Sequence, residues 1–393
     1  MSGSPAEAGN RSTEQLERAA RAAADWEQTK WIDLVCEGGG VLGIGLVGAY
    51  AVLEARGYRV QNLAGTSAGA IVATLIAAGY TAAEVRDIIF DLDFSRITDP
   101  HPEARLALIG GRWLGWGASV LRHQGIYRGD FFLELMREKL AAKGVTTFRQ
   151  LRYEDGKSPD PRYRHKVQVI VSDVTNRRLL RLPMDAKAVL GVEPDDLPVA
   201  EAVRMSMSIP FFFSPVRWSW KHPDGKQQLT LVDGGMLSNF PVWLFDTPEL
   251  PDWPTFGLRL VSPEARDGGG LSLPVPLPPN TGRLLSYALT LVQTMLAAHD
   301  RLYLDSETYA RTIGVPTGSA SGTDFALSEA TKRQLYEAGR AATTEFLDQQ
   351  WSFAEYIATF RSGPRPGRRD ILKDAMARIA AGAPLPTPVS AGG

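Results

Sequence analysis

Two consecutive strand–turn–helix units at residues 31–78 constrain the fold of this chain more than any other feature. The apolar run Trp31–Cys36 is followed closely by three glycines, and Leu42–Ala55 is then predicted to be helical. Tyr58–Leu63 is the next predicted strand, and the predicted helix Ala68–Ala78 follows it after a tight, glycine-rich turn. Strands and helices that alternate in this way form a mostly parallel sheet covered on both faces. We therefore expect an α/β fold.

The rest of the chain adds further strands, one long helix and two loosely organised ends. Strands are predicted at Val167–Val171, Leu229–Val232 and Phe256–Val261. Apolar residues at helical spacing predict a helix at Leu284–Leu302. We expect residues 1–30 to form a polar tail and a helix, residues 31–350 the main domain, and residues 351–393 a C-terminal helix and a flexible tail.

The composition is that of an ordinary globular protein and argues against several classes of function. With 43 basic and 44 acidic side chains the net charge is −1, so no basic excess points to nucleic acid. The single cysteine, Cys36, lies in an apolar run and fits a core thiol better than a second nucleophile. No signal peptide is evident, and the best apolar stretch, Ala68–Gly79, is well short of the ~20 residues that a membrane span requires. We expect a cytoplasmic protein, with contact to a membrane surface and the oligomeric state left open.

The turn after the second strand contains Gly65-Thr66-Ser67-Ala68-Gly69, a G-x-S-x-G pentad. A serine on such a turn projects its hydroxyl from the end of the sheet, because small neighbours allow the chain to bend sharply. The helix that begins at Ala68 directs its free N–H groups and its positive dipole end toward that hydroxyl. A tight turn with an N-capping serine is the structural alternative. The strand–pentad–helix context favours Ser67 as a nucleophile.

The turn after the first strand, Gly38–Gly43, reads "GGGVLG" and allows two interpretations. It fits the dinucleotide pattern G-x-G-x-x-G, but that use requires an acidic residue at the end of the next strand. Tyr58–Gly65 contains no acidic residue, which weakens the nucleotide interpretation. Backbone N–H groups of consecutive glycines can instead form an oxyanion hole for a tetrahedral acyl intermediate. Adjacent strands would place this loop beside Ser67.

A third motif, "LVDGGMLSNFP" at Leu231–Pro241, places Asp233 at the end of an apolar strand. Asp followed by two glycines is also a common turn. In combination with the other two motifs, however, Asp233 can accept the Ser67 proton directly. A carboxylate is a weak base at its ordinary pKa of ~3.9, and burial would raise that pKa and make the proton transfer easier.

These three motifs, in this order, resemble those of the patatin-like phospholipase family. The matching positions are Gly38-Gly39-Gly40-Val41-Leu42-Gly43, Gly65-Thr66-Ser67-Ala68-Gly69 and Asp233-Gly234-Gly235, joined by "VRMSMSIPFFFSP" at Val203–Pro215 and a weaker "DFALS" at 324–328. The core motifs span residues 32–241, and a helical C-terminal part of the same domain would span 283–350. The resemblance implies a three-layer α/β/α fold with a mostly parallel central sheet, and a hydrolase of lipid acyl esters that needs no metal or organic cofactor.

The resemblance also implies the role of each site residue. Ser67 would be the nucleophile and Asp233 the proton acceptor, without a histidine. The backbone of Gly38, Gly39 and Gly40 would form the oxyanion hole. The supporting glycines of the motifs are Gly43, Gly65, Gly69, Gly234 and Gly235.

The glycine loop departs from the family pattern at one position. Many members carry Lys or Arg just before the last glycine of the loop, where this chain has Leu42. A cation there could bind a lipid phosphate or steady the loop. Its absence leaves room for neutral esters or glycolipids beside phospholipids, and Arg204 is a candidate to replace the charge.

Two alternative functions are compatible with the same sequence. In a Ser–His–Asp hydrolase the histidine follows the acid, and His299 is the only histidine after Asp233. That triad usually carries its histidine on a loop, whereas His299 falls in a predicted helix. The other alternative is a signalling or defence effector whose dyad is latent until an activator binds.

Several other segments and side chains are less decisive. The remaining histidines show no metal-ligand spacing: His101, His123, His165 and His222. Trp113 and Trp116 lie in a Leu/Trp-rich segment that suits either a lipid interface or an apolar lid packed on the core. The Gly/Pro-rich segment Glu264–Gly282 has the length of a flap over a site.

Overall fold

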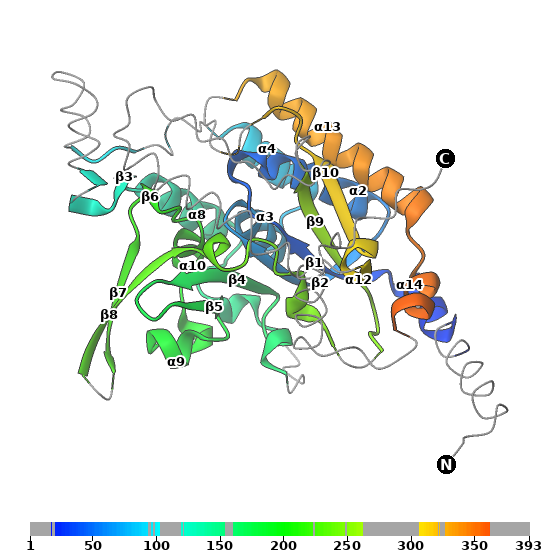
Figure 1. The fold of residues 1–393 in the computed structure, drawn as a ribbon, viewed down its shortest axis with the longest axis horizontal. Coiled ribbons are helices and arrows are strands. Elements are labelled where there is room, and N and C mark those ends of the chain that lie inside the picture. The colour runs from blue at the N-terminus through cyan, green and yellow to red at the C-terminus, as the bar shows by residue number, and fades with distance from the viewer. Residues whose placement is uncertain are drawn as a thin grey trace, which may run out of the picture.

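A largely parallel sheet forms the centre of the molecule in the computed structural model (Figure 1). The structure describes residues 17, 20–92, 96, 99–102, 119–120, 122–153, 160–222, 225–247, 250–261, 306–320, 322 and 327–361. The strand order is β10-β9-β1-β2-β4-β8-β7, and β5 pairs with β4. The strands are β1 Trp31–Cys36, β2 Arg59–Thr66, β4 Val167–Asp173, β5 Arg178–Leu182, β7 Val216–His222, β8 Gly225–Asp233, β9 Thr255–Val261 and β10 Thr312–Pro316.

The direction of the strands changes at β4. The five strands from β10 to β4 run parallel to one another. Strands β5 and β8 pair antiparallel with β4, and β7 pairs antiparallel with β8. The expected fold, with a mostly parallel central sheet, is confirmed, and the antiparallel part lies along the β8–β7 edge.

Helices that include α3, α10 and α13 cover one face of the sheet, and α12 with a short 3-10 helix covers the other. The helices are α2 Gly43–Ala55, α3 Ala68–Ala77, α4 Ala82–Phe90, α8 Asp130–Ala142, α9 Ala186–Leu190, α10 Val199–Ser206, α12 Ser306–Ala310, α13 Glu329–Glu345 and α14 Phe353–Phe360. Helix α3 packs on β1, β2 and β4, α10 packs on β4 and β8, and α13 packs on α2 and β10. On the opposite face, the short 3-10 helix Val242–Phe245 and Tyr309 of α12 pack in a cluster with Val35 and Ala64. These are the three expected layers.

Burial explains why the central strands form where the sequence predicts them. All of β4 is buried, and so is β1 from Ile32 onward, as expected for parallel strands covered on both faces. The prediction for Trp31–Cys36 matches β1 at both ends. Strand β8 begins four residues before the predicted Leu229 because it continues into a hairpin with β7, whose pairing the apolar pattern does not reveal.

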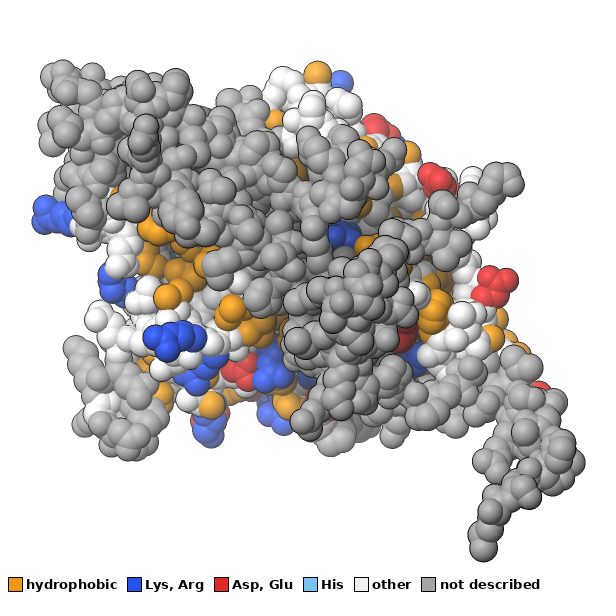
Figure 2. All heavy atoms as spheres, viewed as in Figure 1, with side chains coloured by type: hydrophobic (Ala, Val, Ile, Leu, Met, Phe, Trp, Pro, Cys, Tyr) orange, Lys and Arg blue, Asp and Glu red, His pale blue; other side chains and the backbone are white. Residues whose placement is uncertain are grey.

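A small two-stranded sheet lies beside the main one. It pairs β3 Gly125–Tyr127 with β6 Phe211–Phe213. Hydrophobic side chains gather on the described surface in this region of the molecule, and Lys and Arg lie below them in the same view (Figure 2). Ile209, Phe211 and Phe212 are partly exposed here.

Several predicted segments lie outside the described residues. These are the tail at 1–12, most of the Trp113/Trp116 segment, residues 264–282, the predicted helix Leu284–Leu302 with His299, most of "DFALS", and the end of the chain from residue 362. In the part of the chain that is described, no helix is both long and apolar enough to span a membrane.

Candidate active site

Ser67 lies on a strained turn between β2 and α3. Its backbone has φ 52° and ψ −123°, a region that residues with a side chain rarely adopt. The turn can form because Gly69 packs against β1, where a Cβ atom would lie 2.2 Å from the Cys36 carbonyl oxygen. Ser67 occupies the N-cap position of α3, but its hydroxyl makes no capping hydrogen bond. The structural alternative of a capping serine is therefore wrong, and the strain holds a hydroxyl that the helix does not use.

Ser206 fixes the backbone of this turn. The Ser67 N–H donates to the Ser206 hydroxyl oxygen at 2.9 Å, and that hydroxyl donates to the Ile170 carbonyl of β4 at 2.6 Å. Next to it, the Thr66 hydroxyl donates to the Ser238 carbonyl at 3.0 Å. The turn is thus connected to α10, to β4 and to the segment after Asp233.

Asp233 lies at the end of β8, and the strand β4 lies between β8 and β2. Ile170 of β4 is opposite Thr66, and the next residue, Val171, is opposite Asp233. The ends of β2 and β8 therefore meet at the same point along β4, which brings the predicted nucleophile and acid together. The backbone of Asp233 is held in place because its N–H donates to the Ser208 carbonyl at 2.9 Å.

The Asp233 carboxyl is buried and only one of its oxygens accepts a hydrogen bond from the described residues. Its Oδ1 accepts the Gly235 N–H at 2.8 Å, while Oδ2 is buried without a hydrogen-bond partner among the described residues. Burial raises the pKa of Asp233 to about 7, against the opposing effects of the Ser67 hydroxyl and the Gly235 N–H. A base with a pKa near neutrality is far better matched to general-base work than an ordinary carboxylate.

The glycine loop begins where β1 ends and is clamped by Asn239. The Gly38 N–H donates to the Asn239 carbonyl at 3.0 Å, and the Asn239 amide donates to the Gly38 carbonyl at 3.0 Å. This corrects the expectation that all three glycines offer N–H donors, because the Gly38 donor is already used. Within the described residues, the N–H groups of Gly39 and Gly40 make no hydrogen bond.

Gly40 must be glycine for two reasons. Its φ is 58°, in the left-handed region, and a Cβ atom would lie 2.0 Å from the Gly322 carbonyl oxygen. That same carbonyl accepts the Val41 N–H at 3.0 Å, so the loop is held close to residue 322. Leu42 is only 2% exposed and packs in the core, so the position that carries a cation in many family members faces the interior here.

Arg204 does not replace the missing cation, because its guanidinium is used internally. The side chain is 6% exposed and donates to the carbonyls of Gly129 at 3.1 Å and Ser214 at 3.0 Å. It also donates to the Arg128 carbonyl and the Ser208 hydroxyl. Burial lowers its pKa to about 10. Arg204 therefore braces the segment that carries Ser206 and Ser208.

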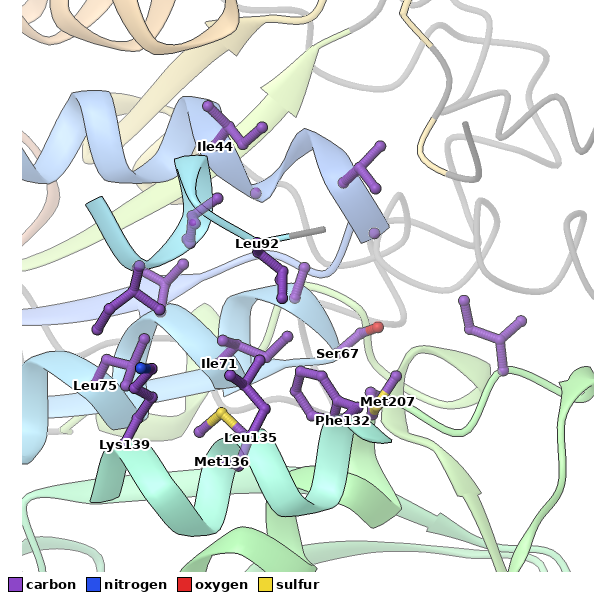
Figure 3. Close-up of a pocket in the computed structure, with 18 of the residues that line it drawn as sticks. Ile44, Ser67, Ile71, Leu75, Leu92, Phe132, Leu135, Met136, Lys139 and Met207 are labelled. Carbon is purple, nitrogen blue, oxygen red and sulfur yellow. The ribbon is translucent and has the colours of Figure 1, made fainter. Parts of the chain in front are cut away.

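An apolar pocket opens beside Ser67 (Figure 3). The start of α2, one side of α3, the end of α4 and one side of α8 line it together with Phe213, and Met207 lies near the serine end. The pocket and its open mouth together span about 780 Å³.

Three of the described histidines, His101, His123 and His165, have structural partners of their own. His101 bonds with the Ser214 hydroxyl at 2.8 Å and stacks on His123, and His165 bonds with Asp195 at 2.8 Å. None is hydrogen-bonded to Ser67 or Asp233. Across the described residues, no three His, Cys, Asp or Glu side chains form a cluster suited to a metal ion. Cys36 is fully buried at the end of β1, and burial raises the pKa of its thiol to about 12, so the prediction of a core thiol is confirmed.

Sequence reasoning missed two residues that hold the site together. Ser206 lies in the "SMS" of Val203–Pro215, and Asn239 lies six residues after Asp233. Both lie inside segments that the motifs cover, Val203–Pro215 and Leu231–Pro241, but nothing in those segments indicates what either side chain contacts. Their partners, Ser67 and Gly38, are more than a hundred residues away in sequence, so the contacts exist only in the folded chain.

The comparisons with known proteins agree with this fold. The family model described as patatin-like phospholipase matches residues 34–246. The uncharacterized protein YqhO of Bacillus subtilis is 38% identical over 323 residues, which cover 82% of this chain and 100% of that protein. The uncharacterized protein R571 of Acanthamoeba polyphaga mimivirus is 25% identical over 315 residues, 78% of this chain and 90% of that protein.

A solved structure, VipD from Legionella pneumophila, is 17% identical and has a TM-score of 0.47, with 89% of this chain and 74% of that chain covered. The class that the fold and the family match define is that of α/β lipid hydrolases. The chain belongs to the patatin-like phospholipase family.

Proposed function

We propose that this protein cleaves ester bonds of membrane lipids, as a phospholipase A or lysophospholipase does, through a Ser67–Asp233 dyad. The observation that carries the proposal is the buried, unpartnered Oδ2 of Asp233 beside a serine hydroxyl that caps nothing. The family of the chain supports lipid hydrolysis in general. The substrate lies in a membrane or micelle, so the protein has to meet a lipid surface to act.

In the proposed reaction, the Ser67 hydroxyl oxygen attacks the ester carbonyl carbon, and its proton passes to Asp233 Oδ2. The N–H groups of Gly39 and Gly40 donate to the oxyanion of the tetrahedral intermediate. The intermediate then collapses, and the leaving alcohol takes the proton from Asp233. Water attacks the acyl-enzyme in the same way, with Asp233 accepting its proton and returning it to Ser67. The products are a fatty acid and an alcohol or lysolipid.

The test is incubation of the purified protein with a panel of phospholipids, lysophospholipids, glycolipids and neutral glycerides, with mass spectrometry of the products. We expect free fatty acid from the wild type and none from Ser67→Ala or Asp233→Asn. We expect His299→Ala to keep most of the activity. An inactive His299→Ala together with an active Asp233→Asn would refute the proposed dyad and support a Ser–His–Asp triad instead.

A fluorophosphonate probe separates a competent enzyme from a latent one. The probe should label Ser67 in the wild type and leave Ser67→Ala unlabelled. A wild-type protein that neither takes the label nor hydrolyses any lipid would instead support the activator-gated effector.

A further inference from the structure

The pocket beside Ser67 has a shape and lining that the chemistry of the dyad does not explain. Its walls expose almost only carbon, and the polar groups lie at its two ends. At one end is Ser67, and at the other is Lys139 of α8, as the close-up shows (Figure 3). Empty apolar space inside a protein costs stability, so a fold that keeps such a space beside a nucleophile needs an occupant to fill it.

Two helices present matching apolar sides to this space. Ile71, Val72 and Leu75 follow Ser67 along α3, and Phe132 and Met136 precede Lys139 along α8. Spacings of three and four residues place each set on one side of its helix. The pocket therefore runs along α3 and α8, between the two helices, and extends away from Ser67.

We propose that this pocket, here called the acyl channel, holds the acyl chain of the scissile ester and selects chains of about ten carbons. The proposal rests on the function proposed above, because the channel begins at Ser67. The ester carbonyl would lie at Ser67, and the methyl end of the chain would point toward Leu75 and Lys139. A hydrocarbon chain is the occupant that an apolar lining between two helices fits.

The length of α3 gives the expected chain length. Eight residues separate Ser67 from Leu75, which is about 12 Å along a helix. In an extended polypeptide, the three backbone bonds of one residue span about 3.5 Å, or about 1.2 Å per bond. An extended acyl chain advances by about the same length per bond. About ten bonds therefore reach the end of the channel.

Lys139 sets the limit at that end. Its side chain is 30% exposed and its ammonium pairs with Glu138 at 2.9 Å, so contact with hydrocarbon would cost this charge its polar surroundings. Lys139 lines the channel, and a lysine can bury its aliphatic stem along apolar surface while it keeps its charged end in water. A longer acyl chain would have to push the ammonium aside or leave its own terminal carbons in water.

The experiment measures kcat/KM for p-nitrophenyl esters with chains of increasing length. In the wild type we expect an increase of up to about fourfold per methylene, the effect of burying one CH2, ending near ten carbons. A profile that stays flat from the shortest to the longest ester would overturn the proposal.

Two variants and a matched control locate the channel. Ile71→Trp blocks it one helical turn from Ser67, so the ratio of the ten-carbon to the four-carbon rate should fall at least about tenfold. Lys139→Ala opens the far end, so the ratio of the fourteen-carbon to the ten-carbon rate should rise at least about threefold. Lys143→Ala changes a lysine at the end of the same helix that pairs with Glu84 and does not line the pocket, and both ratios should stay as in the wild type. Ratios that do not change in Ile71→Trp and Lys139→Ala would contradict the channel.

A binding measurement separates failure of the channel from failure of the proposed function. Ser67→Ala binds but cannot hydrolyse, so its affinity for fatty acids of increasing length is measured by calorimetry. We expect the affinity of Ser67→Ala to rise with chain length up to about ten carbons. The affinity for the ten-carbon acid should be lower in the double variant that carries Ser67→Ala and Ile71→Trp. These two results would support the channel even if no ester is cleaved. If the wild type hydrolyses esters but the affinity of Ser67→Ala does not depend on chain length, the proposed dyad stands and the proposed channel is refuted.

Discussion

Replacing Asp233 with asparagine should inactivate the enzyme and, at alkaline pH, make it more stable. The change is isosteric and keeps an oxygen to accept the Gly235 N–H. It removes a carboxyl group whose pKa burial raises from 3.8 to about 7. In the wild type, the folded state holds this proton more tightly than the unfolded state does. The contribution of Asp233 to stability is therefore fully present below about pH 4 and is lost as the pH rises through 7.

The size of the effect follows from the two pKa values. A difference of one pKa unit corresponds to about 1.4 kcal/mol, so ionising the buried carboxyl lowers the free energy of unfolding by about 4 kcal/mol over the whole range. Between pH 5 and pH 8 the loss is roughly 3 kcal/mol. Asparagine does not ionise and avoids this loss. Its amide group takes the place of the unpartnered Oδ2, and an unsatisfied buried donor costs about 1–3 kcal/mol at every pH.

The assay is urea unfolding of the wild type and Asp233→Asn at pH 5 and pH 8. At each pH, the free energy of unfolding of the wild type is subtracted from that of Asp233→Asn. The prediction concerns how much this difference changes from pH 5 to pH 8. Asp33, whose pKa burial also raises to about 7, is present in both proteins, so its titration cancels in this difference. From pH 5 to pH 8, we expect the free energy of unfolding of Asp233→Asn to rise by roughly 3 kcal/mol relative to that of the wild type. An equal difference at both pH values would refute the raised pKa of Asp233 and the reasoning based on it.

The other predictions concern the rate. Because Asp233 must be ionised to accept a proton, kcat/KM should fall about tenfold per pH unit below about pH 7 and stay level above it, in a stopped assay across pH 5–9. Ser206→Ala should lower kcat about 10- to 100-fold with little change in KM, since the N–H of the nucleophile loses its acceptor, while the remote Thr343→Ala should affect only stability. Gly40→Ala should lower kcat at least about 100-fold, because a Cβ atom would collide with the Gly322 carbonyl, whereas Gly57→Ala, also at positive φ but in open space, should keep its activity.

Most of the fold could be predicted from the sequence because its signals are local. The apolar runs that became β1 and β4, and the glycines that allow the tight turn after β2, act through their immediate neighbours. The order of strands and helices then predicted a largely parallel sheet without any knowledge of distant contacts. The hairpin of β7 and β8 was less visible, because pairing between polar strands leaves only a weak pattern.

The sequence by itself also determined which residues to expect at the site, Ser67, Asp233 and the glycine loop, because each lies in a motif next to a strand end. Only the tertiary structure decided how they are held and what they can do. It showed that the Gly38 N–H is already used, that Arg204 is committed to internal hydrogen bonds, and that Ser206 holds the turn that carries Ser67. The raised pKa of Asp233 has the same origin, because it follows from burial, and burial depends on which distant segments pack around the carboxyl group.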